Sequence, residues 1–171
     1  ARTGSGKTAA FGLPLVDLLD KSTGKVRVLI MAPTRELAVQ VSGQLELYAK
    51  ARGLSVAVVY GGQRMEKELA MIKKWIDILV ATPWRIIDHV KRKKINLSDI
   101  EYFILDEFDE MLKMWFIDDV DYILSMCVNR KRSLFFSATI SKPIQNIITK
   151  YMPQYEHIQI KDVNNMVSTI D

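Results

Sequence analysis

Residues 103–112 read FILDEFDEML, an apolar run that ends directly in a dense group of acids. The apolar residues at its start are typical of a strand that is buried on both faces of a parallel sheet. Because ligands of such sheets collect at the carboxyl ends of the strands, the acids that follow are candidates for a functional site. The large ring of Phe108, in the midst of these acids, is not required by such chemistry.

Similar apolar runs recur along the chain and alternate with stretches of helical spacing. The expected strands lie within residues 26–32, 54–60, 76–81, 102–105, 133–138 and 157–160. The expected helices lie within residues 8–19, 36–52, 86–93, 116–126 and 144–152. Alternation over the whole length predicts an α/β fold: a doubly wound, mostly parallel sheet with helices on both faces.

The composition is that of one globular domain, with 49% hydrophobic and 26% charged residues among 171. A net charge of +4 permits a nucleic-acid partner without requiring one. The single cysteine, Cys127, excludes a disulfide framework and a cysteine zinc site, which fits a reducing compartment. No apolar run approaches the roughly 20 residues that span a bilayer. We therefore expect an intracellular protein, cytoplasmic or nuclear if eukaryotic, without a membrane partner.

The first eight residues, ARTGSGKT, have the pattern of a phosphate-binding loop in front of a helix. Gly4 and Gly6 let the backbone curl so that N–H groups point at a phosphate. Lys7 adds a cation for the β- and γ-phosphates, and the Thr8 hydroxyl can reach Mg²⁺. The following helix places its positive end at the same point. The strict pattern has glycine at the first position, where this chain has Ala1.

The acids of FILDEFDEML acquire a role beside this loop. Asp106 stands at the carboxyl end of its strand, where P-loop proteins hold Mg²⁺ through a second acid. Glu107 can orient and deprotonate an attacking water. For these residues alone, an acidic helix start with Asp109 as N-cap is an equal alternative.

Two further segments, PTRELA at 33–38 and TPWR at 82–85, each follow an apolar strand and open a helix. Each has threonine as the expected N-cap and arginine in the first turn, where acidic side chains are normally preferred. An anion such as a nucleic-acid phosphate, facing both the arginine and the positive helix end, would offset their repulsion. The doublet at 61–62 would let a backbone approach the same polymer closely. The segment SAT at 137–139 ends another strand, and its hydroxyls can hydrogen-bond a neighbouring carboxylate.

In this order and spacing, ARTGSGKT, PTRELA, GG, TPWR, DEFD and SAT closely resemble the motifs of the first RecA-like domain of DEAD-box RNA helicases. The resemblance makes residues 1–162 RecA-like domain 1 and residues 163–171 the start of an interdomain linker. It implies an enzyme that couples the binding and hydrolysis of Mg-ATP to binding of the single-stranded RNA backbone and to local duplex unwinding. It also implies a second RecA-like domain as partner, and we expect a monomer.

The resemblance implies roles for particular residues. ATP binding is implied for Thr3, Gly4, Ser5, Gly6, Lys7 and Thr8. Catalysis is implied for Lys7, Asp106 and Glu107, and metal binding for Thr8 and Asp106. RNA-backbone binding is implied for Pro33, Thr34, Arg35, Gly61, Gly62, Thr82 and Arg85. Coupling of nucleotide state to RNA binding is implied for Asp109, Ser137 and Thr139.

Four large aromatic residues depart from the family pattern. Trp75, Trp84 and Trp115 stand where glycine is usual, and Phe108 stands where alanine is usual. We expect Trp84 to keep helical angles and to weaken RNA binding by its bulk. We expect Trp75 and Trp115 to need positive φ, at a cost of roughly 1–2 kcal/mol each. Overpacking at Phe108, at about 1–3 kcal/mol, is expected to push Asp109 away from its coupling partners.

Two other functions remain open. One is another superfamily-two P-loop NTPase, such as a DNA helicase, and PTRELA and SAT favour the RNA family over it. The other is a catalytically impaired RNA-binding variant, against which the retained Lys7, Thr8, Asp106 and Glu107 argue. Stimulation by RNA or by DNA would separate the two helicase classes.

We predict negligible RNA-stimulated ATPase activity for the 171 residues alone. The adenine-recognition motif, the arginine fingers and half of the RNA site that the resemblance implies are not in this sequence. Phosphate release measured with and without single-stranded RNA tests this expectation, and a robust RNA-dependent rate would contradict it.

Overall fold

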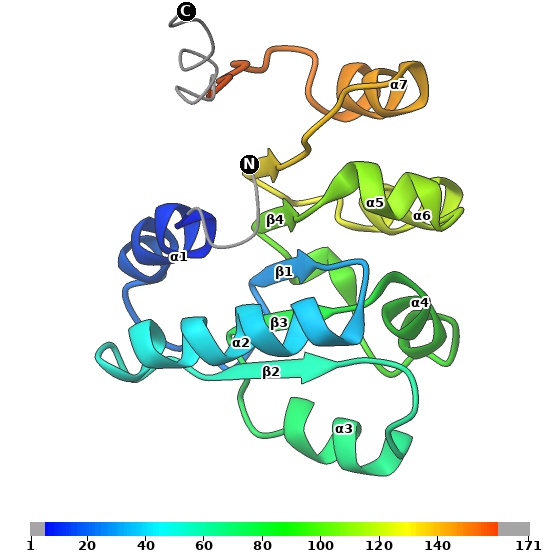
Figure 1. Cartoon of the computed structure of the whole chain (residues 1–171). Coiled ribbons are helices and arrows are strands. Elements are labelled where there is room, and N and C mark those ends of the chain that lie inside the picture. Colours follow the sequence, from blue (N-terminus) through cyan, green and yellow to red (C-terminus); the bar gives the residue numbers. More distant parts are fainter. Residues whose placement is uncertain (1–5, 161–171) are drawn as a thin grey trace, which may run out of the picture.

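The structure is a computed structural model that describes residues 6–160. In this range, five strands form one sheet flanked by helices (Figure 1). The expectations for Thr3, Gly4, Ser5 and the linker at 163–171 lie outside the described residues. The α/β fold that the alternating pattern predicts is confirmed.

Every pairing in the sheet is parallel. The strands are β1 (Val28–Met31), β2 (Val56–Val59), β3 (Ile78–Ala81), β4 (Tyr102–Leu105) and β5 (Arg132–Phe135), in the order β2-β3-β1-β4-β5. The last residues of neighbouring strands are register partners, as Met31 is with both Ala81 and Leu105. The five strands therefore end at one level, and the segments that follow them leave the sheet at one edge.

Helices cover both faces of the sheet. They are α1 (Lys7–Leu18), α2 (Arg35–Lys50), α3 (Met65–Ile72), α4 (Pro83–Lys91), α5 (Phe108–Lys113), α6 (Ile117–Met126) and α7 (Lys142–Tyr151), with the 3₁₀ turn η1 (Leu97–Asp99) before β4. Within residues 6–160, no helix combines the length and the apolar character that crossing a membrane requires.

The two core layers follow from the alternation of side chains along each strand. Val28 and Ile30 of β1 face the layer formed with α1 and α2. Leu29 and Met31 face the layer formed with α4, α5, α6 and α7. All four side chains are fully buried, which explains why the strand is apolar without alternation.

Two parts of the sequence-based assignment differ from the structure. The strand expected within residues 157–160 is wrong: this segment is irregular, and Ile158 and Ile160 are exposed. It pairs with no strand of the described sheet. Helix α3 was missed, because its eight residues present only a short pattern of three- and four-residue spacing. Helix α5, of six residues, was expected only in the alternative that has Asp109 as N-cap.

The expectation that Trp75 and Trp115 need positive φ is confirmed, at φ 65° and φ 63°. Trp115 follows α5, where its amide donates to the carbonyl of Leu112 and the next amide donates to the carbonyl of Met111. This is the pattern of a Schellman helix end, which glycine normally occupies. The indole is 88% exposed, so packing does little to offset the strained backbone.

We predict that Trp115→Gly is more stable than Trp115→Ala by about 1 kcal/mol, because alanine retains the Cβ that disfavours positive φ. Both variants remove the same exposed indole, so alanine is the matched control. Urea unfolding followed by circular dichroism measures the difference. Equal midpoints for the two variants would contradict the strain.

Candidate nucleotide and nucleic-acid site

The common edge of the sheet gathers the described site residues. β2 is followed by Gly61 and Gly62, β3 by Thr82 and Arg85, β1 by Pro33, Thr34 and Arg35, β4 by Asp106, Glu107 and Asp109, and β5 by Ser137 and Thr139. The strand order thus places the residues expected to bind RNA in the segments after β2, β3 and β1, and the acids and their hydroxyl partners in the segments after β4 and β5.

The start of α1 meets the end of β4 at an ion pair. Lys7 Nζ donates to Asp106 Oδ1 at 2.8 Å across 99 residues of sequence, and both side chains are nearly buried. Gly6 holds the N-cap position of α1 at φ 79°, a conformation that glycine adopts at little cost. Together with Thr8 and Glu107, these residues line a cavity of about 210 Å³.

The groups at this cavity fit a magnesium–phosphate ligand. Mg²⁺ in proteins commonly uses one or two carboxylates and completes its shell with water and phosphate oxygens. Asp106 and the Thr8 hydroxyl supply oxygens there, and Lys7 supplies a cation for phosphate. Residues 6–160 contain no group of three or more His, Cys, Asp or Glu side chains placed to hold a metal.

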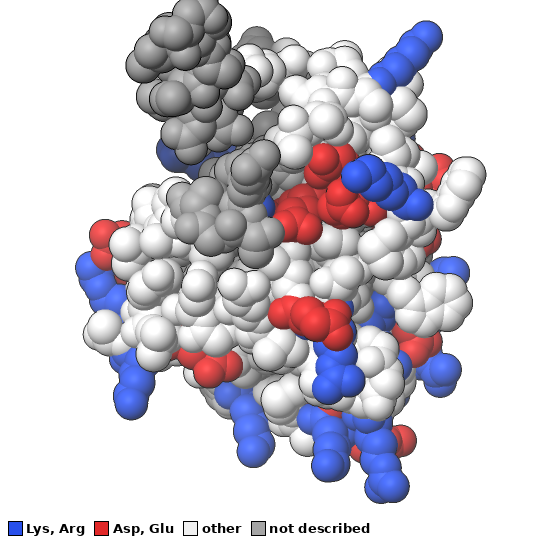
Figure 2. Space-filling model, in the orientation of Figure 1, with Lys and Arg blue, Asp and Glu red and all other residues white. Residues whose placement is uncertain are grey.

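Acidic side chains gather on this face of the molecule near β4 and α5, whereas lysines and arginines lie mainly toward the lower rim of the view (Figure 2). Such a concentration of negative charge repels a bare polyphosphate. A cation bound together with the phosphates would offset that repulsion. The charge distribution therefore favours a metal–nucleotide complex over the nucleotide alone.

Glu107 has a strained backbone. It occupies the left-handed region at φ 51° and ψ 55°, at the N-cap position of α5, which costs roughly 1–2 kcal/mol for a residue with a side chain. Asp106 and Glu107 line the same cavity although they are neighbours in sequence. Strain of this kind tends to occur at functional sites.

The three residues expected to couple nucleotide and RNA are brought together. The Asp109 amide donates to Ser137 Oγ at 3.2 Å, and Ser137 Oγ donates to the Thr139 carbonyl at 2.6 Å. Thr139 Oγ1 lies 3.4 Å from Asp109 Oδ2, to which it donates. Asp109 is inside the first turn of α5, so the alternative in which it caps the helix is wrong.

Phe108 does not displace Asp109, so that expectation is wrong. The ring is fully buried beneath α5 and packs edge-on against Phe135, with centroids 5.6 Å apart. Its amide donates to the Phe136 carbonyl at 2.9 Å, which ties the start of α5 to the end of β5. The extra volume is taken up by the core, away from the hydroxyls that contact Asp109.

The two threonines before α2 and α4 behave differently. Thr34 Oγ1 accepts the Leu37 amide at 3.3 Å and caps α2 as predicted. Thr82 occupies the N-cap position of α4, as predicted, but its side chain makes no cap hydrogen bond. Trp84, in the first turn of α4, has the helical backbone that was predicted, and its indole is 69% exposed. Pro33 is buried, so its side chain is not offered to a ligand.

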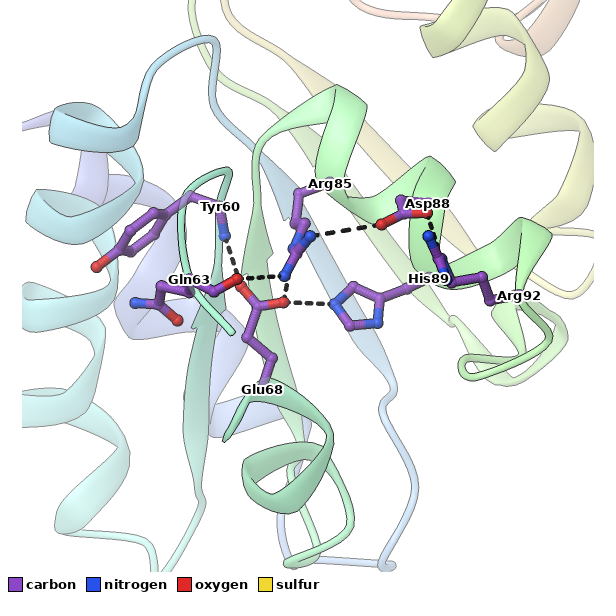
Figure 3. Close-up of polar contacts among 7 residues, drawn as sticks. All are labelled: Tyr60, Gln63, Glu68, Arg85, Asp88, His89 and Arg92. Atoms are coloured by element: carbon purple, nitrogen blue, oxygen red, sulfur yellow. Dashed lines mark hydrogen bonds and ion pairs between the residues drawn. The ribbon is translucent and has the colours of Figure 1, made fainter. Parts of the chain in front are cut away.

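The two arginines also differ. Arg35 is exposed, with its guanidinium 4.8 Å from the centre of the Tyr60 ring. The Arg85 side chain is only 11% exposed and is held inside a polar cluster (Figure 3). Its Nε donates to Glu68 Oε2 at 2.7 Å and its Nη2 to the Gln63 carbonyl at 2.8 Å. Arg85, which was expected to face RNA, is therefore held by hydrogen bonds to groups inside the protein.

Glu68 is the residue of this edge that the sequence interpretation missed. It is fully buried in α3 and receives hydrogen bonds from Arg85 and the Tyr60 amide, with His89 Nε2 2.6 Å from Oε2. One signal was available: Glu68 falls between Met65 and Ile72 at three- and four-residue steps, on the apolar side of the helix. An acid in that position needs a buried partner.

The family model and the relatives that match this chain are all helicases. The family model for the DEAD/DEAH box helicase matches residues 1–147. The chain is 44% identical to the ATP-dependent RNA helicase DeaD of Haemophilus influenzae, over 100% of this chain and 28% of that protein. It is 41% identical to the DEAD-box ATP-dependent RNA helicase CshA of Bacillus subtilis, over 99% of this chain and 34% of that protein.

Among solved structures, a DEAD box protein from the hyperthermophile Methanococcus jannaschii superposes with a TM-score of 0.85 at 46% identity. The match covers 91% of this chain and 42% of that one. The chain therefore spans less than half the length of each of these relatives.

We predict that Phe108→Ala lowers the free energy of unfolding by about 3–5 kcal/mol, because it leaves a cavity in the core beneath α5. Phe108→Leu is the control, since it keeps most of the volume. Chemical denaturation measures both variants. A Phe108→Ala protein as stable as the wild type would show that the ring is strained rather than packed.

Proposed function

Because the chain belongs to the DEAD/DEAH box helicase family, we propose that it is the Mg-ATP-binding half of an ATP-dependent RNA helicase. The observation that carries the proposal is the ion pair between Lys7 and Asp106 at the cavity. A phosphate-binding lysine and a strand-end carboxylate, far apart in sequence, meet where a metal and a phosphate can be bound together. The intact pair also favours a working ATP site over a catalytically impaired variant.

In the proposed mechanism, the ion pair is the resting arrangement of the site. Lys7 neutralises the buried Asp106 carboxylate. With Mg-ATP bound, Asp106 and Thr8 would hold the metal, and Lys7 Nζ would donate to phosphate oxygens. Glu107, held by its strained turn at the same cavity, orients the attacking water and accepts its proton. Bound magnesium offsets the charge of the phosphates.

RNA would bind along the β2, β3 and β1 part of the same edge. The exposed Gly61–Gly62 turn lets a phosphate backbone approach closely, and Arg35 offers an exposed cation. The Thr82 hydroxyl is not used as a cap and remains for a phosphate oxygen. Contacts of this kind recognise phosphate and ribose, so sequence preference would be weak.

Coupling would run through the Asp109, Ser137 and Thr139 contacts, because they join the segment that carries Asp106 and Glu107 to the end of β5. Hydrolysis and local unwinding would need the second RecA-like domain, and the chain alone would be inactive. The relatives named above are RNA helicases, which favours RNA over DNA as the polymer. We propose a monomeric, intracellular protein.

A titration with a fluorescent ATP analogue, with and without Mg²⁺, tests the nucleotide site. We expect binding that Mg²⁺ strengthens, and an Asp106→Asn variant in which most of that Mg²⁺ dependence is lost. Asp118→Asn is the matched control, because Asp118 is exposed on α6 and the substitution is the same. The proposal would be contradicted if the wild-type protein did not bind the ATP analogue. It would also be contradicted if Mg²⁺ strengthened binding to the Asp106→Asn variant as much as binding to the wild type.

A further inference from the structure

Glu68 joins three elements of the carboxyl edge through one carboxylate. It lies in α3, whose eight residues pack beside β2, and its side chain is 0% exposed. Oε1 accepts the Tyr60 amide at the end of β2, at 3.2 Å. Oε2 accepts from Arg85 at 2.7 Å and is 2.6 Å from His89 Nε2, and both of these residues belong to α4 (Figure 3).

The Glu68–Arg85 pair holds both ends of the glycine turn. At one end the Tyr60 amide donates to the Glu68 carboxylate. At the other end the Gln63 carbonyl accepts from Arg85 Nη2 at 2.8 Å. Between these anchors lie the exposed Gly61 and Gly62, the latter at φ 91°. The turn itself has no side chains beyond hydrogen at these two positions, so its conformation depends on the anchors.

Arg85 retains capacity for another ligand. A guanidinium carries five N–H groups, and within residues 6–160 three of its hydrogen bonds are made: to Glu68, to Gln63 and, at 3.4 Å, to Asp88. The Asp88 carboxylate is shared with Arg92, whose hydrogen bond lowers the pKa of Asp88. The remaining N–H groups and the 11% of the side chain that is exposed leave room for one phosphate oxygen.

His89 completes the cluster. Its Nε2 lies 2.6 Å from Glu68 Oε2, and its Nδ1 is buried without a hydrogen-bond partner among residues 6–160. Glu68 Oε2 therefore contacts two side chains of α4, those of Arg85 and His89.

We propose that Glu68 is a positioning residue for RNA binding: it fixes the Gly61–Gly62 turn relative to the first turn of α4 and orients Arg85 toward an RNA phosphate. This inference rests on the proposed function, since it names what organises the RNA-binding half of that site. A buried ion pair is weak evidence of stability, because desolvation offsets its attraction. The effect of the Glu68–Arg85 pair is to set the position of the Gly61–Gly62 turn relative to the first turn of α4. Its directional hydrogen bonds do this more specifically than apolar contacts would.

The test is RNA binding by the full 171-residue chain, measured by fluorescence anisotropy with labelled oligouridine at several salt concentrations. The variants are Glu68→Ala, Glu68→Gln, Arg85→Ala and the double variant Glu68→Ala/Arg85→Ala. Glu66→Ala and Glu66→Gln are matched controls, since Glu66 is exposed on the same helix and loses the same charge. Binding of the fluorescent ATP analogue, on the other side of the edge, reports that each variant is folded.

We expect Glu68→Ala to weaken RNA binding about tenfold, as loss of buried hydrogen bonds does. It should also reduce the salt dependence by about 0.7 in log–log slope, the value for one phosphate contact on a single strand. Arg85→Ala should do the same, and the double variant should be no more than about twofold weaker than Arg85→Ala, because the two residues act as a unit. Glu68→Gln keeps the shape but cannot accept from all its donors, so a smaller loss is expected. The Glu66 variants should bind RNA as the wild type does.

Each result decides between the proposals. Wild-type protein that binds the nucleotide but not RNA would overturn the RNA part of the proposed function, and this inference with it. Wild-type binding with an unchanged Glu68→Ala variant would overturn the inference alone. Fully additive losses, or a weakened Glu68→Ala variant with the wild-type salt slope, would also overturn it. If Glu68→Ala fails to fold, Glu68→Gln carries the test, and affinity and slope equal to those of Glu66→Gln would overturn the inference.

Discussion

The parallel register of the sheet is the constraint on which the rest of the structure depends. Because neighbouring strands end on paired residues, every segment that follows a strand emerges at the same edge. Motifs that are scattered over more than a hundred residues of sequence thereby become neighbours. The strand order then divides this edge into two parts, with β1 between the glycine turn and Arg85 on one side and the acids on the other. One edge of the sheet thus carries both groups of candidate site residues.

Each part of the edge is organised around a buried carboxylate with a basic partner. Asp106 is paired with Lys7, and Glu68 is paired with Arg85. A buried carboxylate without a partner is strongly disfavoured, so each acid fixes the position of its cation. The two pairs differ in what surrounds them: the first lines a cavity, whereas the second is enclosed by hydrogen bonds to backbone groups and to His89. The Lys7–Asp106 pair is therefore suited to exchanging its mutual contact for contacts with a ligand. The Glu68–Arg85 pair is suited to holding two chain segments in place.

The large aromatic residues are accommodated in three different ways. Phe108 enters the core and packs against Phe135 without disturbing the contacts of Asp109. Trp84 lies on an ordinary helical backbone and projects from the surface. Trp75 and Trp115 remain in left-handed conformations that suit glycine, and both indoles are largely exposed. Bulk is thus absorbed where the core can repack, while backbone strain persists where side-chain packing cannot relieve it.

The sequence by itself determined the α/β class and the five strands, and it singled out Lys7 and Asp106 as candidate site residues, because apolar runs and short motifs are local features of the chain. It did not determine the partners of Glu68, since one acid on a short helix carries no local sign of the arginine and histidine that it meets. The expected strand at 157–160, which pairs with no described strand, was wrong, and so was the expected effect of Phe108, whose ring packs against Phe135 of β5. Only the tertiary structure decided these points, because burial and charge pairing depend on what distant segments bring to the same place.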